Sequence, residues 1–332
     1  MPDELRDPLV SVVIPTYNRE SVLRRTLASL AVQSLSAGRF DVCVVDDGSS
    51  DGTASIAAEA FPFALRVLRL PRQGPTAARN AGAQNSRGEV LIFLDDDIRP
   101  APNTLEVLER TCLEIDRGII LGTLITPEFR KASVIGRLLA ASPFREAAAT
   151  ADRDLPFTAC LTGLLAIRRS SFFEIGMFMD PTGGWPNWDD VDFGYRAQRA
   201  GFRLRQSAAS IAEHWDDALA DLASACQRWQ RASQSAVRLF QKYPDLRAEI
   251  PMFVDKAPID WRHDAPVLIG RKIARRLVSS APILPGLEWL ARQLEQRWPS
   301  ERLLQVLYRW IVGAYMFRGY QLGLEELRCS TR

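Results

Sequence analysis

Residues 90–97 read Val90-Leu-Ile-Phe-Leu94-Asp95-Asp96-Asp97, an apolar run that leads directly into three carboxylates. A short run that is apolar on both faces predicts a buried strand of a parallel sheet. Adjacent carboxylates repel one another unless a cation neutralises them. Mg²⁺ and Mn²⁺ prefer oxygen ligands, which they often share with a diphosphate. By itself, the triplet fits a metal site and a solvated acidic turn equally well.

Upstream of this stretch, predicted strands alternate with predicted helices. Strands are expected over residues 10–14, 40–45 and 65–70, and helices over 19–34, 53–60 and 76–86. This alternation predicts an α/β fold with a mostly parallel sheet covered by helices on both faces. Ligands of such sheets bind beyond the carboxyl ends of the strands. We therefore expect the loops at 15–18, 46–47 and 95–97 to meet at one edge.

Two polar segments near this edge are candidate nucleotide contacts. Asp46 and Asp47 precede the residues that a helix cap needs, so at least one is expected to face a base or ribose. The alternative is a turn and cap that include Ser50 and Asp51. Arg79 lies among small residues at 74–82 and could reach a phosphate or a base, or it could be a solvated arginine on a surface helix.

A second group of acids follows a Gly- and Pro-rich loop. Asp189 and Asp190 begin a predicted helix, where acids complement the helix dipole. The dipole accounts for one acid, but it does not account for the aromatic residues beside the pair. Trp185 and Trp188 suit an acceptor pocket, to which we also assign Gly163. Downstream, His214 is either a structural histidine or a metal ligand returned to the sheet edge.

The C-terminal part, residues 218–332, is predicted to be a helical extension rich in Arg, Trp and Leu. Residues 1–217 are predicted to form the catalytic domain, with a nucleotide half at 9–100 and an acceptor half at 101–217. The helices could form a peripheral membrane surface, a cap on the catalytic domain, or a dimer interface. Since buried helices also need Leu and Trp, the cap or dimer interface is the plainer interpretation.

Overall composition excludes several classes of protein. The chain has 332 residues and a net charge of +2, so its charge favours no nucleic-acid partner. The five cysteines lack metal or redox spacing, as expected of reduced thiols in a cytoplasmic protein. There is no apolar run of about 18 residues and no N-terminal secretory pattern, so we expect a protein that does not span a membrane.

Taken together, the motifs resemble the inverting glycosyltransferases of family 2, which have the GT-A fold. The matching segments, in family order, are residues 12–19 (VVIPTYNR), 45–53 (VDDGSSDGT), 78–82 (ARNAG), 93–97 (FLDDD), 163–168 (GLLAIR), 188–196 (WDDVDFGYR), 201–202 (GF) and His214. The resemblance covers roughly residues 9–217. Many members have Glu-Asp where this chain has Asp189-Asp190, which leaves open which carboxylate is the base.

The resemblance implies transfer of a sugar from a nucleoside-diphosphate sugar to an acceptor hydroxyl with inversion. A UDP-sugar is the default donor because UDP is common in the family, and a glycan or lipid-linked molecule is the acceptor, in bacterial cell-surface polysaccharide or glycoconjugate synthesis. The implied nucleotide-sugar contacts are Pro15, Thr16, Tyr17, Asn18, Arg19, Asp46, Asp47, Arg79, Asp95 and Asp96. Asp95, Asp97 and His214 would hold Mn²⁺ or Mg²⁺, and Asp190 or Asp189 would be the base. Asp96 would be an orienting or solvated neighbour if the strand continued.

Two rival interpretations follow from the same residues. A nucleotidyltransferase also places acids beside a parallel sheet, but it usually has a Gly-rich phosphate loop near its first strand, and residues 15–19 lack those glycines. A degenerate sugar-nucleotide-binding or scaffold protein would be expected to have lost the base or the metal acids, and both are present. The location implied is cytoplasmic, with peripheral contact to the inner face of the plasma membrane and an oligomer both left open.

Overall fold

The computed structural model describes residues 9–127, 134–140, 151–182, 188–215, 221–297 and 300–330. The chain divides into two compact units. Unit 1 consists of Met1–Pro127, Ser142–Asp180 and Asp189–Asp216, and unit 2 of Glu128–Ala141, Pro181–Trp188 and Asp217–Arg332. Each unit has its own buried apolar core.

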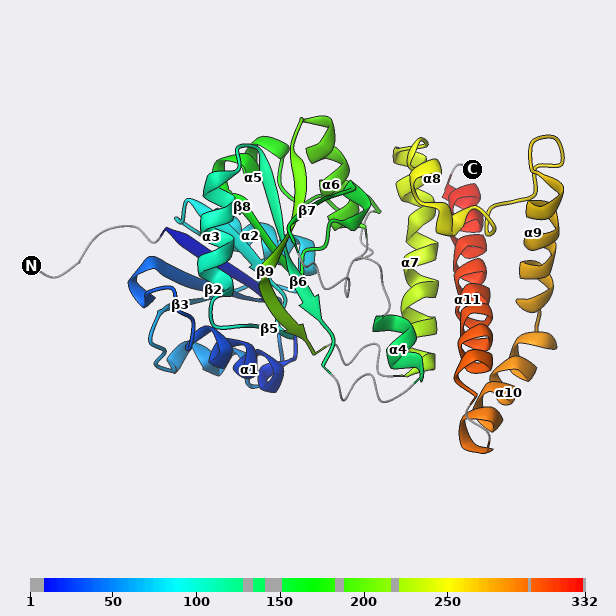
Figure 1. Cartoon of the computed structure of the whole chain (residues 1–332), viewed down its shortest axis with the longest axis horizontal. Coiled ribbons are helices and arrows are strands. Elements are labelled where there is room, and N and C mark those ends of the chain that lie inside the picture. Colours follow the sequence, from blue (N-terminus) through cyan, green and yellow to red (C-terminus); the bar gives the residue numbers. More distant parts are fainter. Residues whose placement is uncertain are drawn as a thin grey trace, which may run out of the picture. The chain divides into compact units, whose positions relative to one another are not determined.

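Unit 1 is built on a nine-stranded mixed sheet in the order β3-β2-β1-β4-β8-β6-β9-β5, with β7 paired to β9 (Figure 1). Strands β1 (Val10–Thr16), β2 (Phe40–Asp46), β3 (Ala64–Arg69) and β4 (Val90–Leu94) are parallel. β8 (Leu164–Arg168) runs antiparallel between β4 and β6 (Gly118–Ile125). β9 (Arg203–His214) is parallel to β6 and antiparallel to β5 (Ile98–Pro100) and β7 (Arg153–Leu155).

Helices cover both faces of this sheet because alternate residues of its central strands are apolar on each side. Val12 and Ile14 join the core formed with α1 (Glu20–Leu30) and α3 (Thr104–Glu114). Val13, between them in sequence, joins the opposite core, which includes residues of α2 (Pro75–Gln84), α5 (Arg169–Ile175) and α6 (Asp189–Arg199). The predicted α/β fold with helices on both faces of the sheet is confirmed. The sheet is parallel over β1–β4, as predicted, but antiparallel pairings of β5, β7 and β8 make it a mixed sheet as a whole.

The elements differ from the predictions in detail. Residues predicted as a helix at 53–60 form a 3-10 helix, Gly52–Ala58, that Asp51 caps by accepting from the Thr53 amide. β8 begins at Leu164, after a 3-10 turn at Phe157–Ala159 that the sequence did not predict. The short strands β5 and β7 were not predicted, since each has only three residues and no clear alternation.

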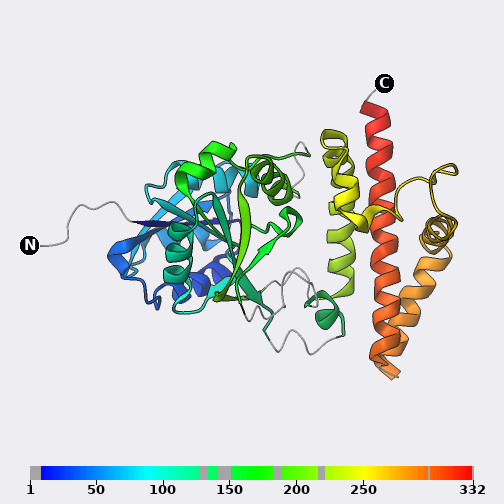
Figure 2. The same ribbon diagram turned by 45° about the horizontal axis from the view of Figure 1, so that its top comes forward.

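Unit 2 is helical, as predicted for the C-terminal extension. Its helices are α4 (Val134–Ala140), α7 (Leu222–Lys242), α8 (Leu246–Glu249), α9 (Pro266–Val278), α10 (Ile283–Arg297) and α11 (Glu301–Ser330). Within this unit, α11 lies between α7 on one side and α9 with α10 on the other (Figures 1 and 2). None of the helices in the described ranges is long and apolar enough to cross a membrane.

The contact between α7 and α11 is close because α11 carries glycines there. A Cβ atom on Gly319 would lie 2.0 Å from the Gln230 carbonyl oxygen, and one on Gly323 would lie 2.3 Å from that of Gln234. The two glycines are four residues apart, so they lie on one face of α11. Their lack of side chains lets the backbones of the two helices approach.

Candidate functional site

The loops after β1, β2 and β4 meet at one edge of the sheet, as predicted. The Thr16 hydroxyl donates to Asp96 Oδ2 at 2.8 Å, which joins the loops after β1 and β4. The Asp47 amide donates to the Thr16 carbonyl oxygen at 2.9 Å, and the Asn18 amide to Ser49 Oγ at 2.8 Å. Asn18 has a φ of 50°, a left-handed conformation that asparagine tolerates better than most residues.

Arg19 neutralises two of the three acids that follow β4. Its Nη1 lies 2.9 Å from Asp96 Oδ1, and its Nη2 lies 3.0 Å from Asp97 Oδ2. β4 ends at Leu94, so the three acids are not part of the strand and their side chains need not alternate between its two faces. Asp96 and Asp97 can therefore both face the Arg19 guanidinium. The interpretation of Asp96 as a solvated neighbour is wrong, because its side chain is buried and also accepts from Thr16. Burial raises the pKa of Asp96 to about 7, against the lowering effect of Arg19.

Asp97 and His214 lie together. His214 ends β9, opposite Ile98 of β5, and its Nε2 lies 3.5 Å from Asp97 Oδ1. Burial by itself would raise the pKa of Asp97, but the hydrogen bond and charge of His214, followed by Arg19, hold it well below its ordinary value. The Asp97 carboxylate is therefore ionised at neutral pH.

The three predicted metal ligands are not gathered into one cluster. Over the described ranges, no group of three or more His, Cys, Asp or Glu side chains is arranged to hold a metal ion. Asp95 turns to Arg79 rather than to Asp97 and His214. A carboxylate oxygen and an imidazole nitrogen are nevertheless suitable donors for Mn²⁺, so the chemistry of Asp97 and His214 fits a divalent metal ion with further ligands from outside the protein.

Arg79 links the triplet to the acids of α6. Its Nη2 lies 2.8 Å from Asp95 Oδ1, and its Nη1 lies 3.4 Å from Asp189 Oδ2. Its side chain is 9% exposed, so it is not the solvated surface arginine that the sequence left open. Thr76, in the first turn of the same helix, donates its hydroxyl to Asp189 Oδ2 at 2.9 Å. Asp189 is thus held by two side chains of α2.

Asp190 has a different environment from Asp189. Its Oδ1 accepts from the Val191 amide at 2.8 Å in the first turn of α6. Burial, and then the negative charge of Asp189, raise the pKa of Asp190 to about 7, while the Val191 amide and Arg79 lower it. A carboxyl group with such a pKa exchanges its proton near neutral pH, which is the property that a general base needs.

Asp46 and Asp47 bind different parts of the surrounding loops. Asp46 Oδ1 accepts from the Ser49 amide at 2.8 Å. Asp46 Oδ2 is buried without a hydrogen-bond donor among the described residues, and Arg69 Nε lies 3.8 Å away. Asp47 accepts from the amides of Gln73 and Gly74 at 2.7 and 2.8 Å, so it orders the segment that follows β3.

The remaining predicted residues are more dispersed. Pro15 lies within β1, and the Tyr17 ring has the Arg72 guanidinium 4.4 Å from its centroid. The Gly163 carbonyl accepts from the Asp95 amide at 3.0 Å, which places Gly163 beside the triplet. Trp188 belongs to unit 2, where its indole donates to the Ala232 carbonyl at 2.7 Å. Trp185 lies outside the described residues.

The sequence interpretation missed Thr76, Arg69 and Arg72. The two arginines flank the carboxyl end of β3, which is parallel to β2 and so ends at the same edge of the sheet. That signal was present, because the rule for parallel strands applies to β3 as well. Thr76 had no such signal, since its partner Asp189 is 113 residues away.

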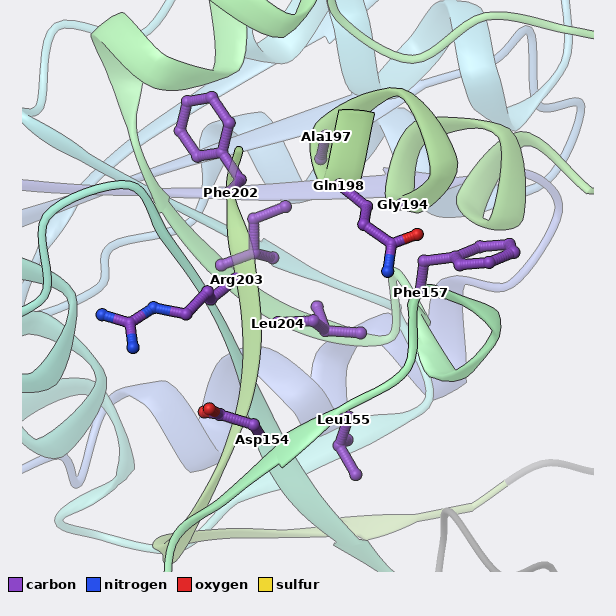
Figure 3. Close-up of a pocket in the computed structure, with 10 residues that line it drawn as sticks. Asp154, Leu155, Phe157, Gly194, Ala197, Gln198, Phe202, Arg203 and Leu204 are labelled. Atoms are coloured by element: carbon purple, nitrogen blue, oxygen red, sulfur yellow. The ribbon is translucent and has the colours of Figure 1, made fainter. Parts of the chain in front are cut away.

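A small, mostly apolar pocket lies apart from the triplet. It is lined by residues of β6, β7, β9 and α6, among them Leu155, Gln198 and Leu204, and by Phe202 between α6 and β9 (Figure 3). Ile119, which lines the pocket, and Leu91 of β4 both pair with the same residue of β8. The pocket is therefore near the start of β4, whereas the three acids follow the end of that strand. None of the predicted site residues lines this pocket.

Comparisons with known proteins bear on the family and the fold of the chain. Residues 11–175 match the family model described as glycosyl transferase family 2. The validoxylamine A glucosyltransferase of Streptomyces hygroscopicus subsp. limoneus is 27% identical over 276 residues, which are 73% of this chain. The match spans only 58% of that protein's length. The undecaprenyl-phosphate 4-deoxy-4-formamido-L-arabinose transferase of Pseudomonas aeruginosa is 40% identical over 114 residues, 32% of this chain and 34% of that protein.

Among solved structures, the chain is similar to the mannosyltransferase PcManGT from Pyrobaculum calidifontis in complex with GDP-Man and Mn²⁺. The TM-score is 0.61 at 21% identity, and the likeness covers 97% of this chain and 90% of that one. At 21% identity, this structural similarity is evidence for the fold alone. With the family match and the geometry of the sheet edge, it leads to one conclusion: the chain belongs to glycosyltransferase family 2 and has the GT-A fold.

Proposed function

We propose that the protein transfers a sugar from a nucleoside-diphosphate sugar to an acceptor hydroxyl with inversion at the anomeric carbon. The observation that carries this proposal is Asp190, a carboxyl group with a pKa raised to about 7 at the start of α6. Its neighbour Asp189 is joined through Arg79 to Asp95 of the triplet. The proposed proton acceptor is therefore linked by side-chain contacts to the sheet edge where the loops after β1, β2 and β4 meet, and where we propose that the nucleotide binds.

In this proposal, Asp190 takes the proton of the acceptor hydroxyl as its oxygen attacks the anomeric carbon. The bond from that carbon to the diphosphate breaks on the opposite face, so the sugar inverts in a single displacement. Asp189 does not act as the base, because Thr76 and Arg79 already hold its Oδ2. Its role is to orient Arg79 and to raise the pKa of Asp190.

The nucleotide would lie over the loops after β1, β2 and β3. Asp46 Oδ2, buried without a donor among the described residues, would accept from an N–H of the base, since an unsatisfied buried acceptor is costly. The cations Arg69 and Arg72 flank the carboxyl end of β3, where they would attract the negatively charged donor. Asp47 would hold the 73–74 backbone in place rather than contact the base.

Asp97 and His214 would hold a divalent metal ion, which would offset the negative charge of the departing diphosphate. The solved mannosyltransferase that shares the fold contains Mn²⁺. Asp95, bound to Arg79, would orient that arginine toward the donor instead of acting as the third metal ligand. Arg19 contributes a second positive charge beside Asp97.

A UDP-sugar is the first candidate donor because UDP is common in the family, and the GDP-Man of the solved mannosyltransferase makes a GDP-sugar the second. The Pseudomonas relative is named for undecaprenyl-phosphate, which supports a lipid-linked acceptor in cell-surface glycan synthesis. All five cysteines are free, which suits the reducing cytoplasmic side of a membrane.

The test is a donor screen combined with one substitution. We expect the full chain with Mn²⁺ to release the nucleoside diphosphate from one class among UDP-, GDP- and dTDP-sugars. Asp190→Asn should lower kcat by about 10²–10⁴-fold while leaving donor affinity, measured by calorimetry, close to wild type. Asp116→Asn, an exposed acid after α3, serves as the matched control.

Three results would contradict the proposal in different ways. Turnover by Asp190→Asn near the wild-type rate would remove Asp190 from the role of base. Release of pyrophosphate from a nucleoside triphosphate would indicate a nucleotidyltransferase. Tight binding of sugar nucleotides without turnover, in the presence of a range of glycan and lipid-linked acceptors, would indicate a non-catalytic binding protein.

A further inference from the structure

The solvent-exposed side of α9 and α10 carries large apolar side chains. They are Val267, Ile273 and Leu277 on α9, and Ile283, Trp289 and Leu290 on α10. Leu277 is 56% exposed and Trp289 62% exposed. We call these six residues the apolar face. An exposed apolar set of this kind on adjacent helices indicates an interaction surface, because single exposed residues are usually scattered.

The apolar face points away from the core of unit 2. On α9, Ile273 and Leu277 are four residues apart and share one side, whereas the buried Lys272 and Ser279 lie on the other. On α10, Trp289 lies opposite Leu284 and Ala291, which are buried in the core with α11. Figures 1 and 2 show α9 and α10 on the side of α11 away from α7.

The charges beside the apolar face are positive. α9 contains no acidic residue, and its exposed Arg271 and Arg276 lie on either side of the Ile273–Leu277 stripe. Its other two cations are engaged internally: Lys272 Nζ lies 2.5 Å from Asp264 Oδ2, and Arg275 Nε lies 3.0 Å from Asp255 Oδ2. The two arginines therefore present their charge outward together with the apolar side chains.

The acids of α10 are directed to partners inside the unit. Glu288 accepts from the Tyr315 hydroxyl at 2.8 Å, and Glu295 accepts from that of Tyr308. Both tyrosines belong to α11. Arg292 and Arg297 of α10 are exposed. Glu295 is exposed and Glu288 half-buried, but both carboxylates are hydrogen-bonded to tyrosines of α11, whereas exposed arginines accompany the apolar side chains on the outer side.

These observations favour one kind of partner. A second copy bound through the same face would bring two positively charged surfaces together, and such like-charge contacts are unfavourable. Nucleic acid would satisfy the arginines but not the aliphatic Ile273 and Leu277. The surface of an anionic bilayer satisfies both, because apolar side chains enter the boundary of the acyl chains while arginines meet the phosphates.

We propose that α9 and α10 bind peripherally to a bilayer that contains anionic lipid. Ile273, Leu277 and Trp289 enter at the depth of the headgroups, and Arg271 and Arg276 contact lipid phosphates. This inference does not depend on the proposed catalytic chemistry. It rests on the exposed apolar residues and on the separation of charge within unit 2.

Flotation of the full chain with vesicles tests the proposal. We expect binding to vesicles of phosphatidylglycerol and phosphatidylcholine, weaker binding as salt is raised, and little binding to phosphatidylcholine alone. Arg271→Gln with Arg276→Gln should weaken binding by about fivefold for each arginine. Leu277→Ser with Trp289→Ser should weaken it by about tenfold or more.

Val32→Ser and Arg110→Gln are matched controls, since both side chains are exposed and belong to unit 1, whereas α9 and α10 belong to unit 2. Circular dichroism of each variant checks that the fold is kept. The proposal is overturned if the chain binds neither vesicle, if neutral vesicles bind it equally well, or if both double variants bind like wild type. It is also overturned if light scattering shows a dimer that these same substitutions dissociate.

Discussion

Asp189 and Asp190 are adjacent in sequence, yet their carboxyl groups have different surroundings. Asp189 is held by the side chains of Thr76 and Arg79. Asp190 is left with a backbone amide and an acidic neighbour, which raises its pKa to about 7. One acid held by neighbouring side chains, beside another whose pKa is raised, is typical of sites where one acid positions and the other transfers a proton.

The pH dependence of turnover should follow this difference. A base must be ionised, so kcat/KM should rise about tenfold per pH unit below pH 7 and level off above it. Asp189→Asn removes the like charge and should move this limb to lower pH. Asp189 and Arg79 are the charged groups that act on Asp190, while burial holds the pKa of the Cys160 thiol well above its ordinary value. The rate should be measured over pH 5–9.

The effect on folding has the opposite sign. Because the folded-state pKa of Asp190 is above the ordinary value, the native state binds this proton more tightly than the unfolded chain does. Its contribution to stability is therefore present at acidic pH and falls as the pH rises toward 7.

For the catalytic prediction, a kcat/KM that stays flat from pH 5 to 8 in the wild type would be incompatible with Asp190 as the base.

At the scale of elements, the contact of α7 with α11 depends on two glycines that the periodicity of the sequence did not single out. Gly319 and Gly323 face the carbonyl oxygens of Gln230 and Gln234. A backbone oxygen cannot turn aside as a flexible side chain can. These positions therefore determine how closely the two longest helices of unit 2 pack.

Gly319→Ala should destabilise unit 2 by about 1–3 kcal/mol, because the added methyl group overlaps the Gln230 carbonyl. Gly286→Ala on α10 is the matched control. A Cβ there meets nothing within 4 Å, so alanine should stabilise the helix by up to about 1 kcal/mol. Urea unfolding monitored by circular dichroism measures both. If the two substitutions shift the midpoint in the same direction, the close packing is not what limits this position.

At the scale of the whole molecule, the residues proposed to bind donor and metal all belong to unit 1. Asp46, Arg79, Asp97, Asp190 and His214 lie in its segments. The proposed lipid surface lies on α9 and α10 of unit 2. The proposed donor site and the proposed lipid surface therefore lie in separate parts of the chain, and binding at each can be measured without the other.

Hydrogen exchange should reveal this separation. We expect a nucleoside diphosphate with Mn²⁺ to protect peptides from the loops after β1, β2 and β4, because ligand binding stabilises the native form of the segments that it contacts. Peptides from α9 and α10 should exchange as before. Asp97→Asn should remove the part of the protection that requires Mn²⁺. Protection confined to α9 and α10, or identical protection with and without metal, would contradict the assignment.

Much of the fold was predictable because its signals are local. Apolar runs such as 10–14 and 90–94, separated by helical spacing, indicate strands of a parallel sheet. The same rule places the residues after each strand at one edge, and this convergence of Thr16, Asp47 and Asp96 is observed. The antiparallel insertion of β8 beside β4 was not predictable, since strand order depends on pairing between segments about 70 residues apart.

The sequence by itself determined the type of fold, the helical C-terminal part and most of the chemical groups at the sheet edge. It did so because side-chain periodicity and the ends of parallel strands are set locally. Only the tertiary structure decided which acid is held by Arg79, which is left to exchange a proton, and that Arg19 spans Asp96 and Asp97. Those properties depend on burial and on charges brought together from distant segments, and neither is a property of a motif alone.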